Sequence, residues 1–394
     1  MNISAILIFN CGSSSIKFAL INPTTEQEYL KGIVECVGTD EASLTWSIKE
    51  DKNTELLNQC DYPKAINKIF DIIHQYTQCE IKAVGHRVVH GGEAFSKSIR
   101  INDDVIKAIE DNIALAPLHN PANLAGIKAV KQKYPDLAQV AVFDTAFHQT
   151  LTPKVYLYPL PYDYYQDYQI RVYGFHGISH RYVVAKAANI IDKPLQDCQF
   201  ITAHLGNGAS LSASIGGKSV DTTMGFTPLA GLMMGTRSGD IDPGIHAYLC
   251  EKTGKNIDEI TAILNKQSGL LGVSGISMDM RSLNQAAKLG DERAQLAIEM
   301  FCFRLARMIG AMAVSLSKID ALIFTGGIGE NDRDVRAQVL KQLKILGFKL
   351  DAAANQQSGK ETHGRISTVN SNLALVIPTN EELLIAKDTA VLCK

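Results

Sequence analysis

The stretch Ala5-Ile-Leu-Ile-Phe-Asn-Cys-Gly-Ser-Ser-Ser-Ile-Lys-Phe-Ala-Leu-Ile21 decides the fold class of this chain. β-Branched and aromatic residues stand on both sides of a Gly/Ser turn, which is the pattern of a β-hairpin. The turn, Asn10 to Ser15, brings backbone N–H groups and hydroxyls together with the ammonium of Lys17, and such a nest suits phosphate oxygens. The Asn10 side chain, at the end of the first strand, suits a hydrated cation. Taken alone, a serine-rich turn is more often structural than functional.

The second half of the chain repeats this order. Gln199–His204 has the pattern of a strand, Gly206-Asn207-Gly208 of a polar turn, and Ala209–Ile215 of an alternating strand. Further segments are predicted as strands at 83–90, 138–143, 218–221 and 320–325, and as helices from about 103, after 120, and at 242–266 and 291–318. The segment 291–318 is apolar on most of its circumference, which predicts a central buried helix. Each half therefore begins with a hairpin, and we predict a duplicated α/β fold with a nucleotide cleft between the halves.

Length and composition limit the functional classes. With 394 residues the chain is too long for one compact core and suits two domains. Its net charge of −2 and its scattered basic residues exclude the basic stripe of a nucleic-acid binder. The 8 cysteines form no C-x-x-C pair, which favours free thiols in a reducing compartment. No run approaches the roughly 18 apolar residues of a membrane span, and no secretory signal is evident. We expect a cytoplasmic metabolic enzyme without a membrane partner.

Neither standard phosphate loop is present. Gly217-Lys218-Ser219 resembles the end of a Walker A loop, but Ser212 stands where that motif needs glycine. Gly206-x-Gly208 lacks the third glycine of a dinucleotide fingerprint, because Leu211 takes its place. Phosphate contacts must come from the three strand-to-glycine turns at 10–15, 204–208 and 326–331, since glycine lets the backbone approach a ligand closely.

Gly85–Gly92 contains a candidate for carboxylate recognition. Strand alternation places Arg87 and Val89 on one face and His86 and His90 on the other. A guanidinium beside an aliphatic side chain suits a small carboxylate with a short apolar tail, although a surface ion pair is an equal alternative. The two histidines lack a third metal ligand, so structural roles are favoured for them.

Two further residues are candidates for catalysis. Asp144 stands at the carboxyl end of a buried strand, where functional groups of α/β sheets emerge. It is either the N-cap of a helix starting near Ala146 or a Mg²⁺-binding or acid–base residue. Arg237 is displayed among glycines in Gly235–Pro243, which favours neutralisation of charge on a transferring phosphoryl group.

Together these stretches resemble the acetate kinase family from Asn10 to Glu381. The motifs that carry the resemblance are NCGSSSIKF, GHRVVHGG, PLHNPAN, VFDTAFH, YGFHGISH, HLGNGASL, DTTMGFTPLAGLMMGTRSGDIDPG, FTGGIGEN and PTNEELLIA. The resemblance implies two ribonuclease-H-like domains, as in actin and the sugar kinases, with ATP–Mg²⁺ between them, and a homodimer. Residues 1–148 with a C-terminal helix at 381–394 would form the substrate-side domain, and residues 149–380 the nucleotide-binding domain.

The resemblance also implies roles for individual residues. Asn10, Asp144 and Glu381 would surround Mg²⁺ (or Mn²⁺), and Lys17 would lie close to the ATP phosphates. Arg87 would bind the substrate carboxylate, while His176 and Arg237 would stabilise the phosphoryl group in flight and His119 would help to position it. The substrate pocket would be lined by Val89, Leu118, Phe175 and Pro228. The nucleotide would be held by His204, Leu205, Gly206, Asn207, Gly208, Asp279, Met280, Arg281, Gly327, Ile328, Gly329, Glu330 and Asn331.

The implied reaction is reversible in-line transfer of the ATP γ-phosphoryl group to acetate, giving acetyl phosphate and ADP. A carboxylate with a pKa near 4.3 is already ionised and needs no general base, so Asp144 would orient groups instead. Propionate is the near alternative, because one methylene discriminates by only about 1–3 kcal/mol. A non-catalytic actin-like ATPase would have no reason to place Arg87 beside Val89. A sugar kinase would need Asp144 as a base and would not need Arg87.

Overall fold

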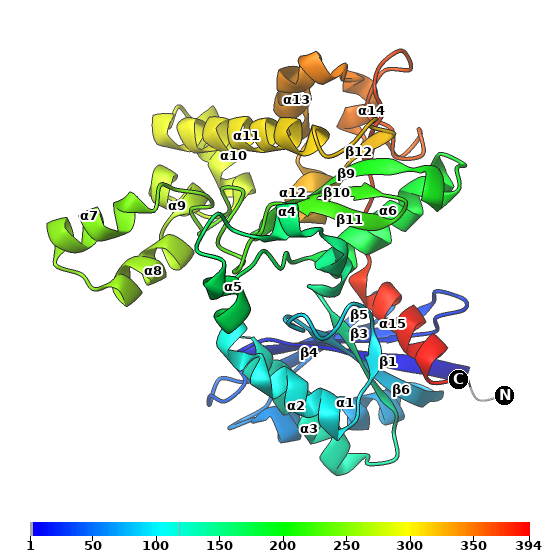
Figure 1. The fold of residues 1–394 in the computed structure, drawn as a ribbon. Coiled ribbons are helices and arrows are strands. Elements are labelled where there is room, and N and C mark those ends of the chain that lie inside the picture. Colours follow the sequence, from blue (N-terminus) through cyan, green and yellow to red (C-terminus); the bar gives the residue numbers. More distant parts are fainter. Residues whose placement is uncertain (1–2, 118) are drawn as a thin grey trace. The chain divides into compact units, whose positions relative to one another are not determined.

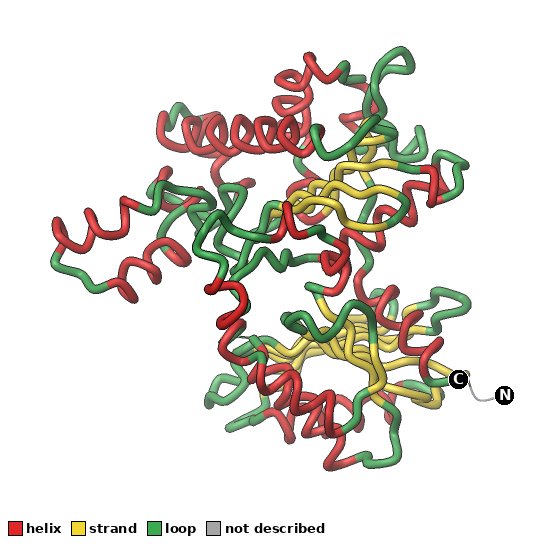
Figure 2. Tube along the Cα trace, viewed as in Figure 1, coloured by secondary structure: helices red, strands yellow, loops and turns green. Residues whose placement is uncertain are grey.

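The chain folds into two compact units, seen in the computed structural model, which describes residues 3–117 and 119–394. The first unit runs to Gln149 and takes up the chain again at Asn380–Lys394, and the second unit is Thr150–Thr379. Each unit contains its own sheet with helices packed on it (Figures 1 and 2).

The first unit is built on an eight-stranded sheet of order β5-β4-β3-β2-β1-β6-β8-β7. Its strands are β1 (Ile3–Cys11), β2 (Ser15–Ile21), β3 (Glu28–Glu35), β4 (Ser43–Ile48), β5 (Asp51–Leu56), β6 (Cys79–Val88), β7 (Ile99–Arg100) and β8 (Gln139–Phe143). The predicted hairpin is confirmed: β1 and β2 are antiparallel, with Asn10 opposite Lys17. On the other side of β1, β6 and then β8 continue the sheet in parallel.

The second unit repeats this topology in a five-stranded sheet of order β11-β10-β9-β12-β13. Its strands are β9 (Gln199–Leu205), β10 (Ala209–Ile215), β11 (Lys218–Thr222), β12 (Ala321–Thr325) and β13 (Ala374–Val376). β9, β10 and β11 form an antiparallel meander, and β12 and β13 follow β9 in parallel. These five strands correspond in order and direction to β1, β2, β3, β6 and β8. The predicted duplicated α/β architecture is therefore confirmed.

Helices cover both faces of the first sheet. They are α1 (Tyr62–Tyr76), α2 (Asp103–Asp111), α3 (Asn120–Lys133) and α15 (Glu381–Leu392), with short 3₁₀ turns at Ile113–Leu115 and Ala146–Thr150. Val84 belongs to the core cluster that contains α1 and α3. Its neighbour Gly85 points to the opposite face, where a Cβ would stand 2.5 Å from Ile385 Cγ2 of α15. Glycine at this position therefore lets the C-terminal helix lie directly on β6.

Most helices of the second unit pack around the second sheet or onto the long helix α11. They are α4 (Pro153–Tyr156), α5 (Asp163–Tyr168), α6 (Gly177–Ile190), α7 (Gly244–Thr253), α8 (Ile257–Lys266), α9 (Gly269–Ser274), α10 (Met280–Lys288), α11 (Glu292–Ala313), α12 (Gly326–Asn331), α13 (Arg333–Gln342) and α14 (Ala352–Gln356), with 3₁₀ turns at Leu195–Asp197 and Leu343–Leu346. The helix predicted over 242–266 is interrupted at Gly254, whose φ of 69° ends α7.

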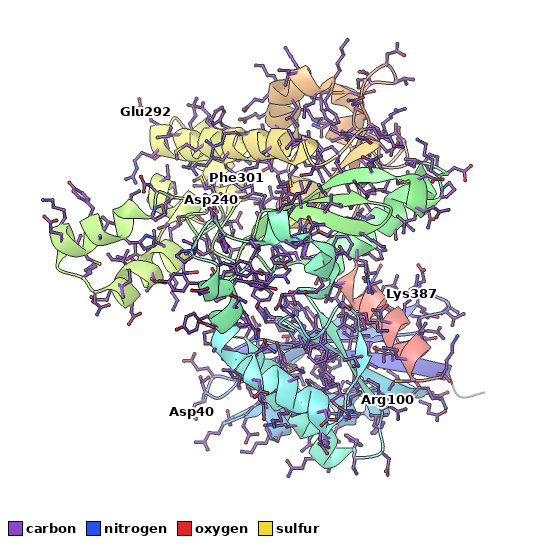
Figure 3. All side chains as sticks on the ribbon, in the orientation of Figure 1. Asp40, Arg100, Asp240, Glu292, Phe301 and Lys387 are labelled. Atoms are coloured by element: carbon purple, nitrogen blue, oxygen red, sulfur yellow. The ribbon has the colours of Figure 1, made fainter. Side chains whose placement is uncertain are left out.

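The prediction for residues 291–318 needs correction. α11 covers Glu292–Ala313 and buries one stripe that includes Phe301, which Figure 3 marks on this helix. Leu296 and Phe303 are 49% and 58% exposed, so α11 is not buried on most of its circumference. Among the residues that the structure describes, none of the helices combines the length and the apolar character that crossing a bilayer requires.

Candidate active site

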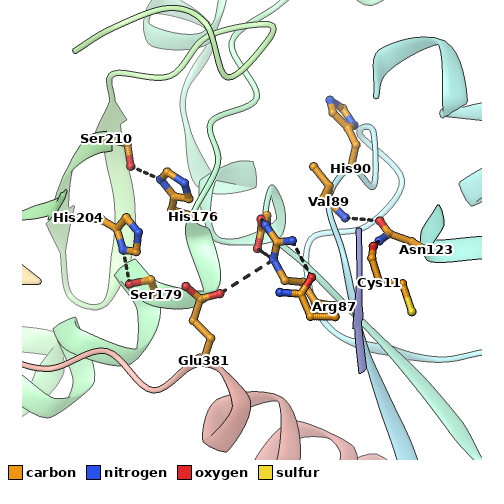
Figure 4. Close-up of polar contacts among 12 residues, drawn as sticks. Cys11, Arg87, Val89, His90, Asn123, His176, Ser179, His204, Ser210 and Glu381 are labelled. Carbon is orange, nitrogen blue, oxygen red and sulfur yellow. Dashed lines mark hydrogen bonds and ion pairs between the residues drawn. The ribbon is translucent and has the colours of Figure 1, made fainter. Parts of the chain in front are cut away.

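The carboxyl ends of two neighbouring parallel strands in the first unit hold a charged cluster. Arg87 is the penultimate residue of β6, and Asp144 directly follows β8. The Arg87 guanidinium donates from Nε to Asp144 Oδ1 (3.3 Å) and from Nη2 to Asp144 Oδ2 (2.5 Å). Its Nη1 donates to Asn10 Oδ1 (3.0 Å), and its Nε lies 4.0 Å from Glu381 Oε2 (Figure 4). One guanidinium thus gathers four segments that are far apart in the sequence.

The cluster places two carboxyl groups beside the single guanidinium of Arg87. Burial and the neighbouring Asp144 carboxylate raise the pKa of Glu381 to about 7, although Arg87 and Lys17 oppose the rise. Burial also raises the pKa of Asp144, and the Arg87 guanidinium opposes this rise. The side chain of Asp144 is only 2% exposed. Two carboxylates that share one guanidinium leave this corner suited to a further cation.

The oxygen atoms of this cluster fit Mg²⁺. Carboxylate and amide oxygens are its preferred protein ligands, and the ion usually completes its shell with water and substrate phosphates. Asn10, Asp144 and Glu381 provide such oxygens. In the described part of the chain no three His, Cys, Asp or Glu side chains form a metal-binding group, so the protein offers part of a coordination shell. His86 and His90 are buried, and burial lowers the pKa of each to about 4.

A buried asparagine connects the turn after β1 with the loop after β6. Asn123 of α3 accepts from the Val89 N–H (3.0 Å) and donates to the Cys11 carbonyl (2.7 Å). Its neighbour on the helix, Asn120, accepts from the His90 N–H and donates to the His90 carbonyl (3.2 and 3.0 Å). Figure 4 shows Asn123 between Val89 and Cys11. Neither asparagine was predicted to have this role, because nothing local in the sequence indicates partners so distant in the chain.

The second unit holds a cluster of histidines beside a glycine turn. His176 precedes α6 with a φ of 57°, and its Nδ1 lies 3.0 Å from Ser210 Oγ of β10. Its ring stacks on His204 at 4.3 Å between centroids. A Cβ at Gly208 would stand 3.3 Å from His176 Nε2 and 3.5 Å from Arg237 Nη1. The Gly206–Gly208 turn, His176 and Arg237 are therefore brought together.

Arg237 is held with its charge largely uncompensated. Its Nη1 donates to the Pro228 carbonyl (3.2 Å), and burial lowers its pKa. Among the described residues, no carboxylate opposes this lowering of the pKa. A half-buried guanidinium with this surrounding is suited to an anionic ligand.

A cavity of about 870 Å³ lies entirely within the second unit. Eight predicted nucleotide residues line it: Gly206, Asn207, Asp279, Met280, Arg281, Gly327, Ile328 and Asn331. Five others do not: His204, Leu205, Gly208, Gly329 and Glu330. Glu330 instead accepts from the backbone N–H of Gly326 (2.8 Å) and Thr379 (3.1 Å), so its carboxylate stabilises the strand-to-helix turn.

The remaining predicted residues lie in both units. In the first, Lys17 is exposed opposite Asn10, Val89 is buried beyond the end of β6, and His119 precedes α3. Leu118 lies outside the described residues. In the second, Phe175 is buried and Pro228 is half-buried.

The comparison with known proteins decides the family. The model of the acetokinase family matches residues 5–387. The chain belongs to the acetokinase family. A protein of Thermoanaerobacterium thermosaccharolyticum named acetate kinase is 51% identical over 392 residues, which are 98% of each chain. The acetate kinase of Bacillus subtilis is 50% identical over 99% of this chain and 100% of its own.

Solved structures of acetokinases agree with this fold. A propionate kinase from Francisella tularensis has a TM-score of 0.95 at 47% identity and covers 99% of this chain and 100% of its own. The acetate kinase of Porphyromonas gingivalis has a TM-score of 0.94 at 42% identity, again over 99% and 100%. This acetokinase therefore has the α/β fold of the solved acetate and propionate kinases.

The cavity of this acetokinase also includes residues that the sequence analysis missed. Asn284, Gln285 and Lys288 of α10 line it together with Arg281. These positions lie on one helical face because they are spaced by three and four residues. That spacing of polar residues after Asp279 was the signal that could have identified them.

Proposed function

We propose that this acetokinase catalyses reversible transfer of the ATP γ-phosphoryl group to acetate, giving acetyl phosphate and ADP. One observation carries the proposal: both carboxylate oxygens of Asp144 accept from Arg87, so Asp144 is held as a charge partner and not left free as a general base. A carboxylate substrate is already ionised at neutral pH and needs no base, whereas a sugar hydroxyl does.

Arg87 binds the substrate carboxylate, and Val89 packs against its methyl group. Arg87 supplies the guanidinium of the cluster, and because its side chain is 21% exposed it can pair with an incoming carboxylate beside Asp144 and Glu381. The buried Val89 is fixed by Asn123, which stabilises a wall for a short apolar tail.

The phosphoryl group is stabilised by positive charge. Arg237 and His176 neutralise the group during transfer, His119 helps to position it, and Lys17 acts near the ATP phosphates. Such a transfer depends on positioning and electrostatics more than on covalent chemistry. The cavity of the second unit holds ATP or ADP, with Asp279, Arg281 and Gly327–Asn331 near it.

Asn10, Asp144 and Glu381 hold Mg²⁺, and Mn²⁺ can replace it. When bound, the metal ion neutralises phosphate charge. The substrate-side domain consists of residues 1–148 with the helix 381–394, and the nucleotide domain of residues 149–380.

The substrate is acetate in preference to propionate. Proteins named acetate kinase are about 50% identical over nearly the whole chain, although one solved structure at 47% identity is a propionate kinase. A longer acid adds one methylene against Val89, which is worth about 1–3 kcal/mol, so weaker use of propionate is expected.

The enzyme acts as a cytoplasmic homodimer. A subunit interface would cover exposed apolar side chains of the second unit such as Ile245, Tyr248 and Phe303. Light scattering coupled to gel filtration tests this: a mass of twice 43.0 kDa is expected, and a monomer would contradict it.

Hydroxylamine trapping tests the reaction. Purified protein with Mg-ATP should form hydroxamate strongly with acetate, weakly with propionate and slightly with butyrate. Arg87→Lys should raise the KM for acetate by about tenfold or more, because a point charge replaces a bidentate fork. If nucleotide binds and none of the three acids gives hydroxamate, the carboxylate-kinase proposal is wrong.

A further inference from the structure

A chain of four side chains in the second unit ends at His176. The Ser210 hydroxyl lies 3.0 Å from His176 Nδ1 and 2.8 Å from His180 Nε2. His180 Nδ1 lies 2.6 Å from Thr202 Oγ1, and Thr202 Oγ1 donates to the Ser212 carbonyl (3.2 Å). Figure 4 shows the contact between Ser210 and His176.

The direction of each hydrogen bond follows from the carbonyl at the far end. A carbonyl only accepts, so the single hydroxyl hydrogen of Thr202 is used on Ser212. Thr202 Oγ1 must then accept from His180, which places a proton on His180 Nδ1.

Burial determines the next link. His180 has no exposed surface, and removing a charged imidazolium from water is costly. A neutral His180 has one proton, already on Nδ1, so its Nε2 accepts from the Ser210 hydroxyl. Ser210 has then used its only hydrogen and can only accept from His176 Nδ1.

We propose that Ser210 is a positioning residue that keeps a proton on His176 Nδ1. His176 Nε2 faces the Gly208 turn and Arg237, and with Nδ1 protonated it carries a hydrogen only in the imidazolium form. His176 therefore contacts a phosphoryl oxygen as a cation and not as a neutral donor. This inference rests on the proposed function, because the anion that it serves is the phosphoryl group.

The alternative tautomer would serve a different chemistry. A neutral His176 with its proton on Nε2 would donate one hydrogen bond without bringing charge. With a neutral His180, this tautomer of His176 would require Ser210 to donate to both rings, and a serine hydroxyl has only one hydrogen. The hydrogen-bond chain therefore excludes the Nε2–H tautomer unless His180 is charged. The chain Thr202–His180–Ser210 thus selects a charged partner for an anionic group, which matches the in-line transfer of a phosphoryl group between two anions.

Nitrogen-15 NMR of the histidine rings tests the tautomer directly. In the wild-type protein, at a pH where His176 is neutral, long-range correlations should identify the Nδ1–H form. Ser210→Ala should convert His176 to a mixture or to the Nε2–H form. The matched control is Ser214→Ala: Ser214 is buried on the same strand and face, and its hydroxyl has no hydrogen-bond partner in the described chain. A wild-type Nε2–H signal, or an unchanged tautomer in Ser210→Ala, would overturn the assignment.

Kinetics gives a second readout. Ser210→Ala should lower kcat by about 10-fold or more, as expected for a misdirected electrostatic group, while both KM values stay within about twofold. Ser214→Ala should change neither. If Ser210→Ala does not fold, Thr202→Val serves instead: it removes the acceptor of His180 Nδ1–H, so the His180 and His176 tautomers should become mixed. Unchanged spectra of Thr202→Val would contradict the relay.

The two proposals can fail separately. Hydroxamate formation together with an Nε2–H form of His176 would contradict the relay and leave the kinase function standing. If His176 has the Nδ1–H form but the protein makes no hydroxamate, the kinase function is contradicted. The tautomer assignment then stands, but the role of His176 toward a phosphoryl group does not.

Discussion

At the scale of single residues, Asn123 connects the two segments that carry Asn10 and Arg87. It binds the Cys11 carbonyl, 112 positions before it in the sequence, and the Val89 N–H, 34 positions before it. Asn123→Asp keeps the acceptor for Val89 but turns an oxygen toward the Cys11 carbonyl. Because misplacement of reacting groups by about 1 Å costs up to about 100-fold, we expect kcat/KM for acetate to fall by at least tenfold.

Asn120→Asp is the matched control for this prediction. Asn120 is an equally buried amide on the same helix, and it holds His90 without reaching the turn after β1. Both variants should have a lower free energy of unfolding in urea denaturation. Only in Asn123→Asp should kcat/KM for acetate fall by more than the loss of stability explains. Rate losses that simply track stability in both variants would show that Asn123 has no special role.

The buried His86 gives a pH-dependent stability. Burial lowers its pKa to about 4, below the ordinary 6.5, so the unfolded chain binds more protons between these values. Stability should therefore fall as the pH drops from about 6.5 to about 4, by up to about 3 kcal/mol for this residue at about 1.4 kcal/mol per pKa unit. His90 contributes in the same direction. Urea denaturation at several pH values in this range measures the free energy of unfolding, which should change less with pH in His86→Gln than in the wild-type protein. An equal pH dependence in both proteins would contradict the assignment.

What the sequence could predict at this scale depends on how far away the partner lies. Asn10, Arg87, Asp144 and Glu381 belong to recognisable motifs, and the structure brings them together. Ser210 has its histidine partners 34 and 30 positions away, and no local pattern indicates such a pairing. Hydrogen-bond partners of this kind are selected only when the elements pack.

At the scale of elements, α13 fixes the short helix α12 through one buried arginine. Arg336 has no exposed surface and donates from Nη1 to the carbonyls of Gly329 and Glu330 (2.9 Å each). Burial lowers its pKa to about 10, so it stays charged at neutral pH. Arg336→Met leaves these carbonyls without their donor, and we expect the free energy of unfolding to fall by about 1–3 kcal/mol for each buried carbonyl left unpaired.

The same variant should weaken nucleotide binding, because Gly327, Ile328 and Asn331 of α12 line the cavity. Titration with a fluorescent ADP analogue measures the affinity, and urea denaturation measures the stability. Lys341→Met, an exposed change on the same helix, is the control and should alter neither quantity. A stable Arg336→Met with normal affinity would contradict the role of α13.

Hydrophobic periodicity predicted correctly that many of the helices and strands exist, but it predicted less well which of their side chains are buried. The helix near 291–318 exists, but Leu296 and Phe303 remain exposed on it. An apolar side chain on a helix predicts burial without telling whether the protein's own core or another surface covers it. The strands β3, β4 and β5 were not predicted. β5 is polar and largely exposed, and β3 and β4 bury only separate apolar residues such as Leu30, Leu44 and Trp46, so none of the three has the apolar run of a central strand.

At the scale of the whole molecule, the C-terminal helix belongs to the first unit. α15 supplies Glu381 and packs on β6 at Gly85. Removal of residues 380–394 should abolish hydroxamate formation. Nucleotide affinity should be retained, since every residue that lines the cavity lies within 150–379.

A fluorescent ADP analogue tests this separation. The control is Lys387→Ala, which removes from α15 only an exposed ion pair with Glu26. This variant should retain both hydroxamate formation and nucleotide affinity. If the shortened chain loses both nucleotide affinity and phosphoryl transfer, the second unit depends on α15.

The return of α15 to the first sheet also sets the order in which the protein can be completed on the ribosome. Residues 150–379 contain every strand of their own sheet, while the first sheet lacks its covering helix until residue 392 is made. At about 5–20 residues per second, the nascent first unit waits roughly 12–50 s for that helix. The segment synthesised first is therefore the last to close, and its uncovered apolar face is where we expect chaperones to bind during translation.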